Sequence, residues 1–338
     1  MTDPAAVARG LVPRNSAAPS TAGSHNPSHG PQLIHALDRH VDLLYGDTRL
    51  FRYVYCPDTP RLESPKPYFH PVRTLAGNKV TVFRPHDHVW HKGIAMTWAQ
   101  LSGQNFWGGP TYVRDKGYVQ LPNNGRMAHQ SWSEMRTPPL QNLERGPGGE
   151  VSLTEHLSWI TESNEPWLDE TRTISVPEIN PTEGYWTLDF DFTLRNTRGQ
   201  PLVFGSPTTE GRPMAGYGGL FWRGPRSFLN GTIFAAGGLS GPDVMGQSAP
   251  WLAFTGKHDG SGAASTVALL DHPTNPRYPT KWFVRNTPYA CASFAFAFDE
   301  ELTLPADSSV RFRYRILIAD GPLTPDHFDA HHASYAAG

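Results

Sequence analysis

The chain has 338 residues, of which 38% are hydrophobic and 18% are charged. This composition supplies a core for one large domain or two ordinary ones, and it has too little charge for a disordered chain. Lys and Arg total 29 against 31 Asp and Glu, so the balance offers no basic face for nucleic acid.

Targeting signals and cysteines narrow the class further. No stretch approaches the roughly 20 apolar residues that cross a bilayer, so no membrane partner is expected. Residues 1–30 lack the apolar segment of a secretory signal. Cys56 and Cys291 are the only cysteines, too few for a disulfide framework or a cysteine-rich zinc site. We therefore expect a cytoplasmic protein.

The first part of the chain differs in composition from the rest. Residues 1–31 are rich in Ala, Ser, Pro, Asn and Gly and show no periodicity, which predicts a disordered tail. Residues 32–338 show strand patterning throughout. We predict that they form a single β-domain.

Alternation of apolar and polar residues predicts the strands. It is clearest in 185–196, where every second residue is apolar and would face a core. The stretch 310–318 repeats the pattern with arginines between the apolar residues, and in 294–298 Phe alternates with Ala, which suits a strand packed on both faces. Further strands are expected at 50–56, 78–84, 93–99, 151–161, 170–176, 201–205, 232–236 and 265–270.

The residues between these stretches favour an all-β fold. The chain contains 32 Gly and 32 Pro, which separate short strands by turns. Helical patterning is scarce, although Thr324 followed by Pro325 is typical of the start of a short C-terminal helix. Many strands, long loops and few short helices predict a large antiparallel β-sandwich.

Three histidines fall within one short loop between two expected strands. In an extended loop His86 and His88 share a face, and His91 could add a third nitrogen, so the three could hold a divalent metal ion. Alternatively, His88 and His91 perform acid–base chemistry, tuned by Asp87 or Lys92, and Asp87 is also a candidate contact for the substrate. The sequence leaves both interpretations open.

A second polar loop, residues 271–285, contains three prolines, which fix φ and stiffen the backbone. His272, Asn275 and Arg277 offer donors and acceptors for hydroxyl groups. Trp282 offers a flat apolar face. This combination suits a polyhydroxylated ligand such as a sugar.

A glycine-rich run, residues 209–223, allows close backbone approach but lacks the spacing of a nucleotide-binding loop. Within it, Glu210 is a candidate general base and Tyr217 a candidate sugar contact. Trp107, in the aromatic and glycine-rich segment 105–109, is a further candidate for contact with a sugar.

Taken together, several segments resemble a bacterial family labelled methane oxygenase PmoA. The resemblance covers roughly residues 35–320. The segments that carry it are Pro67–Thr74, Asp87-His88, His91–Gly93, Asn105–Gly108, Trp159 with Glu170 and Arg172, Ala215–Phe221, and Asp271–Pro279 with Trp282.

The resemblance implies a fold like the galactose-mutarotase supersandwich and a role in carbohydrate catabolism. The methane monooxygenase subunit that shares the label looks like a membrane protein with several spans, which this sequence lacks. The sequence departs from the family pattern at Trp90, where members often have a further histidine, and at His86. The pair carried over is therefore His88 and His91.

Three functional hypotheses follow. The first is an enzyme, of lyase, hydrolase or epimerase type, that acts on a sugar or an oxidised 3-keto glycoside. His88, His91 or Glu210 would move the proton beside the keto group, and Lys92 or Arg277 would stabilise the enolate oxygen. A divalent metal ion could replace them in that role. No other cofactor is indicated, and the oligomeric state stays open.

The second hypothesis is a non-catalytic sugar-binding module. The third is a metal-dependent oxidoreductase, as the family label suggests. The first hypothesis requires that the segments around residues 88, 210 and 277 meet at one cavity.

Overall fold

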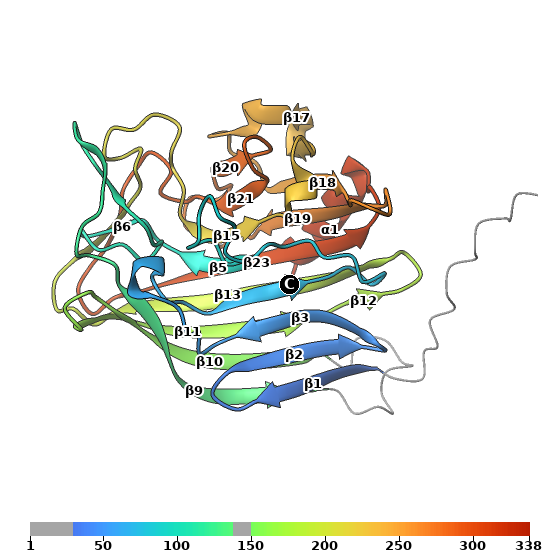
Figure 1. Ribbon diagram of the computed structural model, residues 1–338, viewed down its shortest axis with the longest axis horizontal. Helices are drawn as coiled ribbons and strands as arrows, with labels where there is room; N and C mark the ends of the chain where they lie inside the picture. The colour runs from blue at the N-terminus through green and yellow to red at the C-terminus, as the bar shows by residue number, and fades with distance from the viewer. Residues whose placement is uncertain (1–29, 138–149) are drawn as a thin grey trace, which may run out of the picture.

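The structure is a computed structural model that describes residues 30–137 and 150–338. A disordered tail was predicted for residues 1–31, and residues 1–29 of it lie outside the described residues. The predicted all-β antiparallel sandwich is confirmed: two large sheets overlie one another in Figure 1 and share one hydrophobic core.

Strands of the two large sheets come from alternating parts of the chain. The first sheet has the order β1 (Pro31–Ala36), β2 (His40–Tyr45), β3 (Thr48–Val54), β4 (Tyr68–Val72), β5 (Ile94–Thr97), β15 (Gly219–Arg223), β21 (Cys291–Phe294) and β20 (Trp282–Arg285). The second has the order β17 (Leu239–Ser240), β16 (Thr232–Ala235), β18 (Trp251–Lys257), β19 (Ala264–Asp271), β23 (Ser309–Asp320), β13 (Tyr185–Asn196), β11 (Pro166–Val176), β10 (Val151–Ile160) and β9 (Arg126–Arg136), with β12 (Ile179–Asn180) also paired to β13.

Smaller elements complete the described fold. Two small sheets consist of β22 (Leu302–Leu304), β14 (Leu202–Gly205) and β6 (Gln100–Leu101), and of β7 (Thr111–Val113) and β8 (Gly117–Val119). Short 3-10 turns are η1 (Arg61–Glu63), η3 (Arg226–Phe228), η4 (Ala236–Gly238) and η5 (Gly241–Val244). The predicted C-terminal helix is α1 (Pro325–Ala336), and its Phe328 and Tyr335 pack on the outer face of the second sheet. Within the described ranges, no helix has the length and hydropathy that a membrane span requires.

In β13 and β23 the predicted alternation is confirmed. The two strands pair along nearly their whole length, and the alternating apolar side chains face the core. The charged side chains between them face outward and form ion pairs, Asp189 with Arg315 and Asp191 with Arg311. The polar positions therefore stabilise the outer face while the apolar positions build the core.

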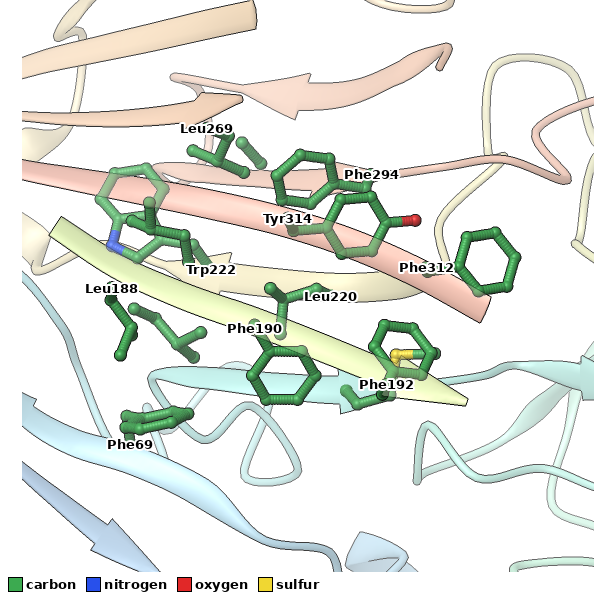
Figure 2. Close-up of a cluster of buried hydrophobic side chains, with 14 of the residues drawn as sticks. Phe69, Leu188, Phe190, Phe192, Leu220, Trp222, Leu269, Phe294, Phe312 and Tyr314 are labelled. Atoms are coloured by element: carbon green, nitrogen blue, oxygen red, sulfur yellow. The ribbon is translucent and has the colours of Figure 1, made fainter. Parts of the chain in front are cut away.

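Aromatic side chains from both sheets meet in this core. Phe69 of β4 lies with its ring centroid 6.4 Å from that of Phe190 of β13. Phe294 of β21 stacks on Tyr314 of β23 at 3.9 Å, and Figure 2 shows these rings gathered between the strands with Phe192 nearby. The core is thus formed by the inner faces of both sheets.

Two strand predictions were wrong. Residues 78–84 form only isolated bridges, because their backbone groups bond to different partners in turn, such as Val82 N to Arg223 O. The alternating phenylalanines at 294–298 do not form one strand, since β21 ends at Phe294. Phe296 stays buried beyond that end and stacks on Phe312.

The first sheet also buries side chains on its outer face. In β15, Trp222 points into the core between the sheets, whereas Phe221 points outward. In β20, Trp282 points inward and Phe283 outward. These outward aromatic residues form the floor of the candidate site.

Candidate functional site

A cavity of about 400 Å³ opens over the outer face of the first sheet. This volume lies within the range of small-molecule sites, roughly 300–1,000 Å³. Its walls come from the loop before β5, the loop after β6, β8, the loop before β15, and β20 with the loop that follows it. Aromatic residues dominate the lining: Trp90, Trp107, Tyr118, Tyr217, Phe283 and Tyr289.

Local sequence explains how the aromatic walls form. Gly109 has a φ of +69°, and a Cβ atom there would lie 2.7 Å from the ring of Trp90. The glycine therefore lets Trp90 pack closely against the segment that carries Trp107. Trp107 in turn contacts Tyr217, with ring centroids 4.5 Å apart. Trp107 and Tyr217, the two expected sugar contacts outside the polar loops, thus line the same cavity.

The histidine loop is folded into two successive turns rather than extended. His88 N donates to Pro85 O and His91 N donates to His88 O, each at 3.0 Å, and Arg84 N closes the loop on His91 O. As a result, the His88 and His91 rings stack with centroids 4.7 Å apart and an angle of 9° between their planes. Both rings line the cavity.

His91 is held in one tautomer by an arginine. Arg223 Nη1 lies 2.8 Å from His91 Nδ1, and because a guanidinium only donates, Nδ1 is the acceptor and the proton lies on Nε2. Burial and then the charge of Arg223 hold the pKa of His91 well below its usual value. His91 is therefore a neutral ring whose Nε2–H, which bonds to none of the described residues, is a donor for a ligand.

His88 takes the opposite tautomer. Its Nδ1 lies 3.2 Å from Asp87 Oδ2, and the same oxygen accepts a bond from Arg223 Nη2 at 2.7 Å. Burial alone would raise the pKa of Asp87, but the hydrogen bond and charge of Arg223 lower it to about 2. The carboxylate therefore accepts the Nδ1 proton, which leaves a lone pair on His88 Nε2.

Burial is also the main cause that lowers the pKa of His88 from its usual value, with Arg223 and Arg285 acting in the same direction. The carboxylate of Asp87 opposes this change. His88 is consequently neutral near pH 7 and able to accept a proton. Two stacked imidazoles thus offer one acceptor and one donor to the same cavity.

The three-histidine metal site does not fit this geometry. His86 is exposed, and its Nδ1 accepts a bond from Arg226 at 2.6 Å. Parallel stacking prevents the in-plane lone pairs of His88 and His91 from converging on one ion. Among residues 30–137 and 150–338, no group of three His, Cys, Asp or Glu side chains is arranged to hold a metal ion.

A family model described as a family of unknown function, DUF6807, matches residues 40–333. The chain belongs to this family. The family model carries no methane-oxygenase label, and no curated protein matches the chain.

Two solved structures share a distant likeness. One is a GH36 alpha-galactosidase AgaA from Geobacillus stearothermophilus in complex with raffinose, at 11% identity and a TM-score of 0.34, with 86% of this chain and 41% of that chain covered. The other is a heparan sulfate lyase HepC mutant from Pedobacter heparinus, at 11% identity and a TM-score of 0.32, with 88% and 33% covered. The chain thus spans less than half the length of either protein.

Two predicted catalytic residues of this DUF6807 member lie outside the cavity lining. Lys92 is buried, where its Nζ bonds to Glu63 and to Val89 O, and burial lowers its pKa to about 8. Glu210 is half-buried on the loop before β15 and does not line the cavity. That loop reaches the cavity through Arg212 and Tyr217 instead.

Residues 271–281 of the second polar loop do not line the cavity either, so the expected convergence of the segments around 88, 210 and 277 is wrong for 277. Arg277 binds the backbone oxygens of Phe296 and Glu301 and lines a different cavity. The Arg313 guanidinium lies against His272 Nε2, and the side-chain amide of Asn275 donates to the backbone oxygen of Arg313.

Trp282 is fully buried in the core, where its Nε1 donates to Ala249 O. It therefore cannot stack on a ligand in this cavity. Its neighbours Phe283 and Arg285 occupy the opposite face of the strand and line the cavity.

Arg223, Arg212 and Arg285 are functional candidates that the sequence prediction missed. A signal was present for two of them. Arg223 follows Phe221 by two residues and Arg285 follows Phe283 by two, so each arginine shares a face with a cavity-side aromatic residue. The choice between the two faces of each strand was the information that the sequence lacked.

Proposed function

We propose that this protein is an enzyme acting on a sugar or an oxidised 3-keto glycoside, with His88 as the general base and His91 as a hydrogen-bond donor to the reacting oxygen. The observation that carries the proposal is the pair of stacked neutral imidazoles with opposite tautomers. One ring accepts a proton while its neighbour donates to the oxygen on which negative charge develops.

The aromatic walls support a sugar as the ligand class. Ring faces cover the C–H surfaces of a sugar, and the tyrosine hydroxyls and histidine nitrogens offer bonds to its hydroxyl groups. Trp107 and Tyr217 form one such wall, close to the buried His91. The cavity is lined mainly by apolar groups with few convergent polar ones, as small-molecule sites generally are.

A 3-keto sugar suits the two rings chemically. His88 Nε2 removes the proton on the carbon beside the keto group, and the electron pair of that C–H bond forms an enolate whose oxygen His91 Nε2–H stabilises. The enolate then expels the glycosidic oxygen, which takes up the proton that His88 now carries, or it takes a proton from water on its other face while His88 returns its own proton to the solvent. The first course is an elimination and the second an epimerisation.

The roles differ from those expected at first. His91 is a donor and not a base, because its Nδ1 is occupied by Arg223 and its Nε2 already carries a proton. It takes the part that Lys92 or Arg277 was expected to play. The geometry lends the metal-dependent oxidoreductase no support, since the histidines do not converge on one point.

A screen of glycosides and their 3-keto derivatives tests the proposal, with products detected by mass spectrometry and with a divalent metal ion either added or chelated. The His88→Ala variant should lose about 10²–10⁴-fold in turnover, the usual contribution of a general base. His86→Ala is the matched control, because His86 is exposed and outside the cavity lining, and it should keep wild-type turnover. Full activity of a folded His88→Ala protein would contradict the role of His88, and binding without any product would favour the non-catalytic module.

A further inference from the structure

The charges around the cavity are of one sign. Arg212 and Arg285 line it, whereas none of the described aspartates or glutamates does. The nearby carboxylate of Asp87 is bound to Arg223 and lines a separate, smaller cavity. A ligand in this site therefore meets guanidinium groups and no opposing carboxylate.

Within the described part of the chain, the Arg285 side chain has no hydrogen-bond or ion-pair partner. It is half-buried at the end of β20, with its guanidinium carbon 5.1 Å from the centroid of the Phe283 ring. It makes no side-chain hydrogen bond there, and no carboxylate oxygen lies within 4.0 Å of it. Partial burial of a guanidinium without an anion is unfavourable, since the charge loses hydration and gains no ion pair.

Several other half-buried arginines are paired with a carboxylate. Arg52 binds Asp42 through two hydrogen bonds of 2.7 and 2.8 Å. Arg315 binds Asp189 in the same way, at 2.6 and 2.8 Å. The fold thus supplies a carboxylate where it holds these guanidinium groups in place, and it leaves Arg285 open to the cavity.

Arg212 is held in place by Tyr118, but it also lacks a carboxylate partner among the described residues. Its Nη1 donates to the hydroxyl oxygen of Tyr118, and its guanidinium carbon lies 4.9 Å from the centroid of that ring. The Tyr118 hydroxyl in turn lies 3.0 Å from that of Tyr217. These contacts fix one edge of the guanidinium and leave its other N–H groups to a ligand.

We infer that the ligand of this cavity carries an anionic group, a carboxylate or a phosphate, and that Arg285 binds this group with support from Arg212. A guanidinium presents parallel N–H donors that match both anions. The inference rests on the proposed function for the sugar part of the ligand, so the predicted class is a sugar acid or a sugar phosphate. Because the charge of Arg285 already acts on His88, the anionic group would lie near the proposed base.

Calorimetric titration tests this inference without any need for turnover. The probes are glucose, glucuronate and glucose 6-phosphate, which share one ring and differ in charge, added to the full chain at low and at physiological salt. We expect one of the two anionic probes to bind about tenfold or more tightly than glucose, the effect of one charge-assisted contact. The stronger of the two identifies the anion as carboxylate or phosphate.

Three variants locate the contact. Arg285→Gln should remove most of the preference for the anionic probe, and Arg212→Gln should remove part of it. Arg226→Gln is the control, because the Arg226 side chain is 58% exposed and lies outside this cavity, and it should keep the preference. Thermal melting of each variant verifies that it is folded.

The outcomes separate this inference from the proposed catalysis. Equal binding of neutral and anionic probes, an unchanged preference in Arg285→Gln, or no binding of either anion at millimolar concentration would overturn the inference. Anion binding through Arg285, together with full turnover by His88→Ala, would instead overturn the catalytic role and leave the anion site intact.

Discussion

The two polar loops of this protein, residues 85–92 and 271–281, look alike in sequence and differ in what their side chains bind. In the first, His88 and His91 each have one nitrogen bound by the protein and one facing the cavity. In the second, the carboxylate of Asp271 accepts bonds from three donors within the loop itself. A polar composition alone therefore does not identify a ligand site; a site also needs polar atoms that the fold leaves without a partner.

The same substitution in each loop tests this contrast with the largest expected effect. Asp87→Asn should lower kcat/KM on the substrate found by the screen by about 10²-fold or more, because an amide no longer fixes the His88 tautomer. Asp271→Asn should leave kcat/KM unchanged. It should instead lower the free energy of unfolding by about 1–3 kcal/mol, because the amide N–H would face a donor.

Steady-state kinetics and urea unfolding measure both quantities. The change in stability with Asp87→Asn should be the smaller of the two, because the Asp87 carboxylate is partly exposed and solvent already screens its ion pair with Arg223. A fall in turnover with Asp271→Asn at constant stability would show that the second loop takes part in function after all.

Substitution of one core tryptophan and one cavity tryptophan tests which face each lies on, with effects of intermediate size. Trp282→Phe removes the bond from Nε1 to Ala249 O in a fully buried position, and we expect a loss of about 1–3 kcal/mol in stability with unchanged ligand affinity. Trp107→Phe alters a cavity wall and should weaken binding several-fold with a smaller loss of stability. Calorimetric titration and urea unfolding check both variants, and the opposite distribution of effects would contradict the assignment of the two faces.

Much of the fold could be predicted from the sequence because its cause is local. Alternation in 185–196 and 310–318 reports directly on which side chains face a core, and those strands are present. The segment 78–84 has a similar pattern, but its backbone bonds to several partners, which no local pattern reveals.

The site was predictable only in part because it depends on contacts between distant segments. The histidine loop, Trp107 and Tyr217 were found from residue type and spacing, and they line one cavity. Arg277 was expected there for the same reason, yet it binds backbone oxygens elsewhere. Alternation along β20 places Trp282 and Arg285 on opposite faces of the strand. Only the packing of β20 on the core shows which face is inside.

The smallest expected difference between the two loops is a shift in the pH profile of kcat/KM. As the base, His88 must be neutral, so kcat/KM should fall as the pH drops through the pKa of His88, which lies below its usual value of 6.5. Arg285→Gln removes a positive charge that lowers this pKa, so the acid limb should move to higher pH by a fraction of a unit. Asp87→Asn removes a negative charge that raises it, so the limb of its residual activity should move to lower pH.

Asp271→Asn in the second loop is the control for the pH profile and should leave the acid limb in place, because Asp271 is not among the charges that act on His88. The two opposite shifts distinguish a titrating His88 from a general loss of structure, which would lower activity at every pH without moving the limb. If Arg285→Gln and Asp87→Asn shifted the limb in the same direction, the titrating group would not be His88, and the first loop would no longer differ from the second in the way described.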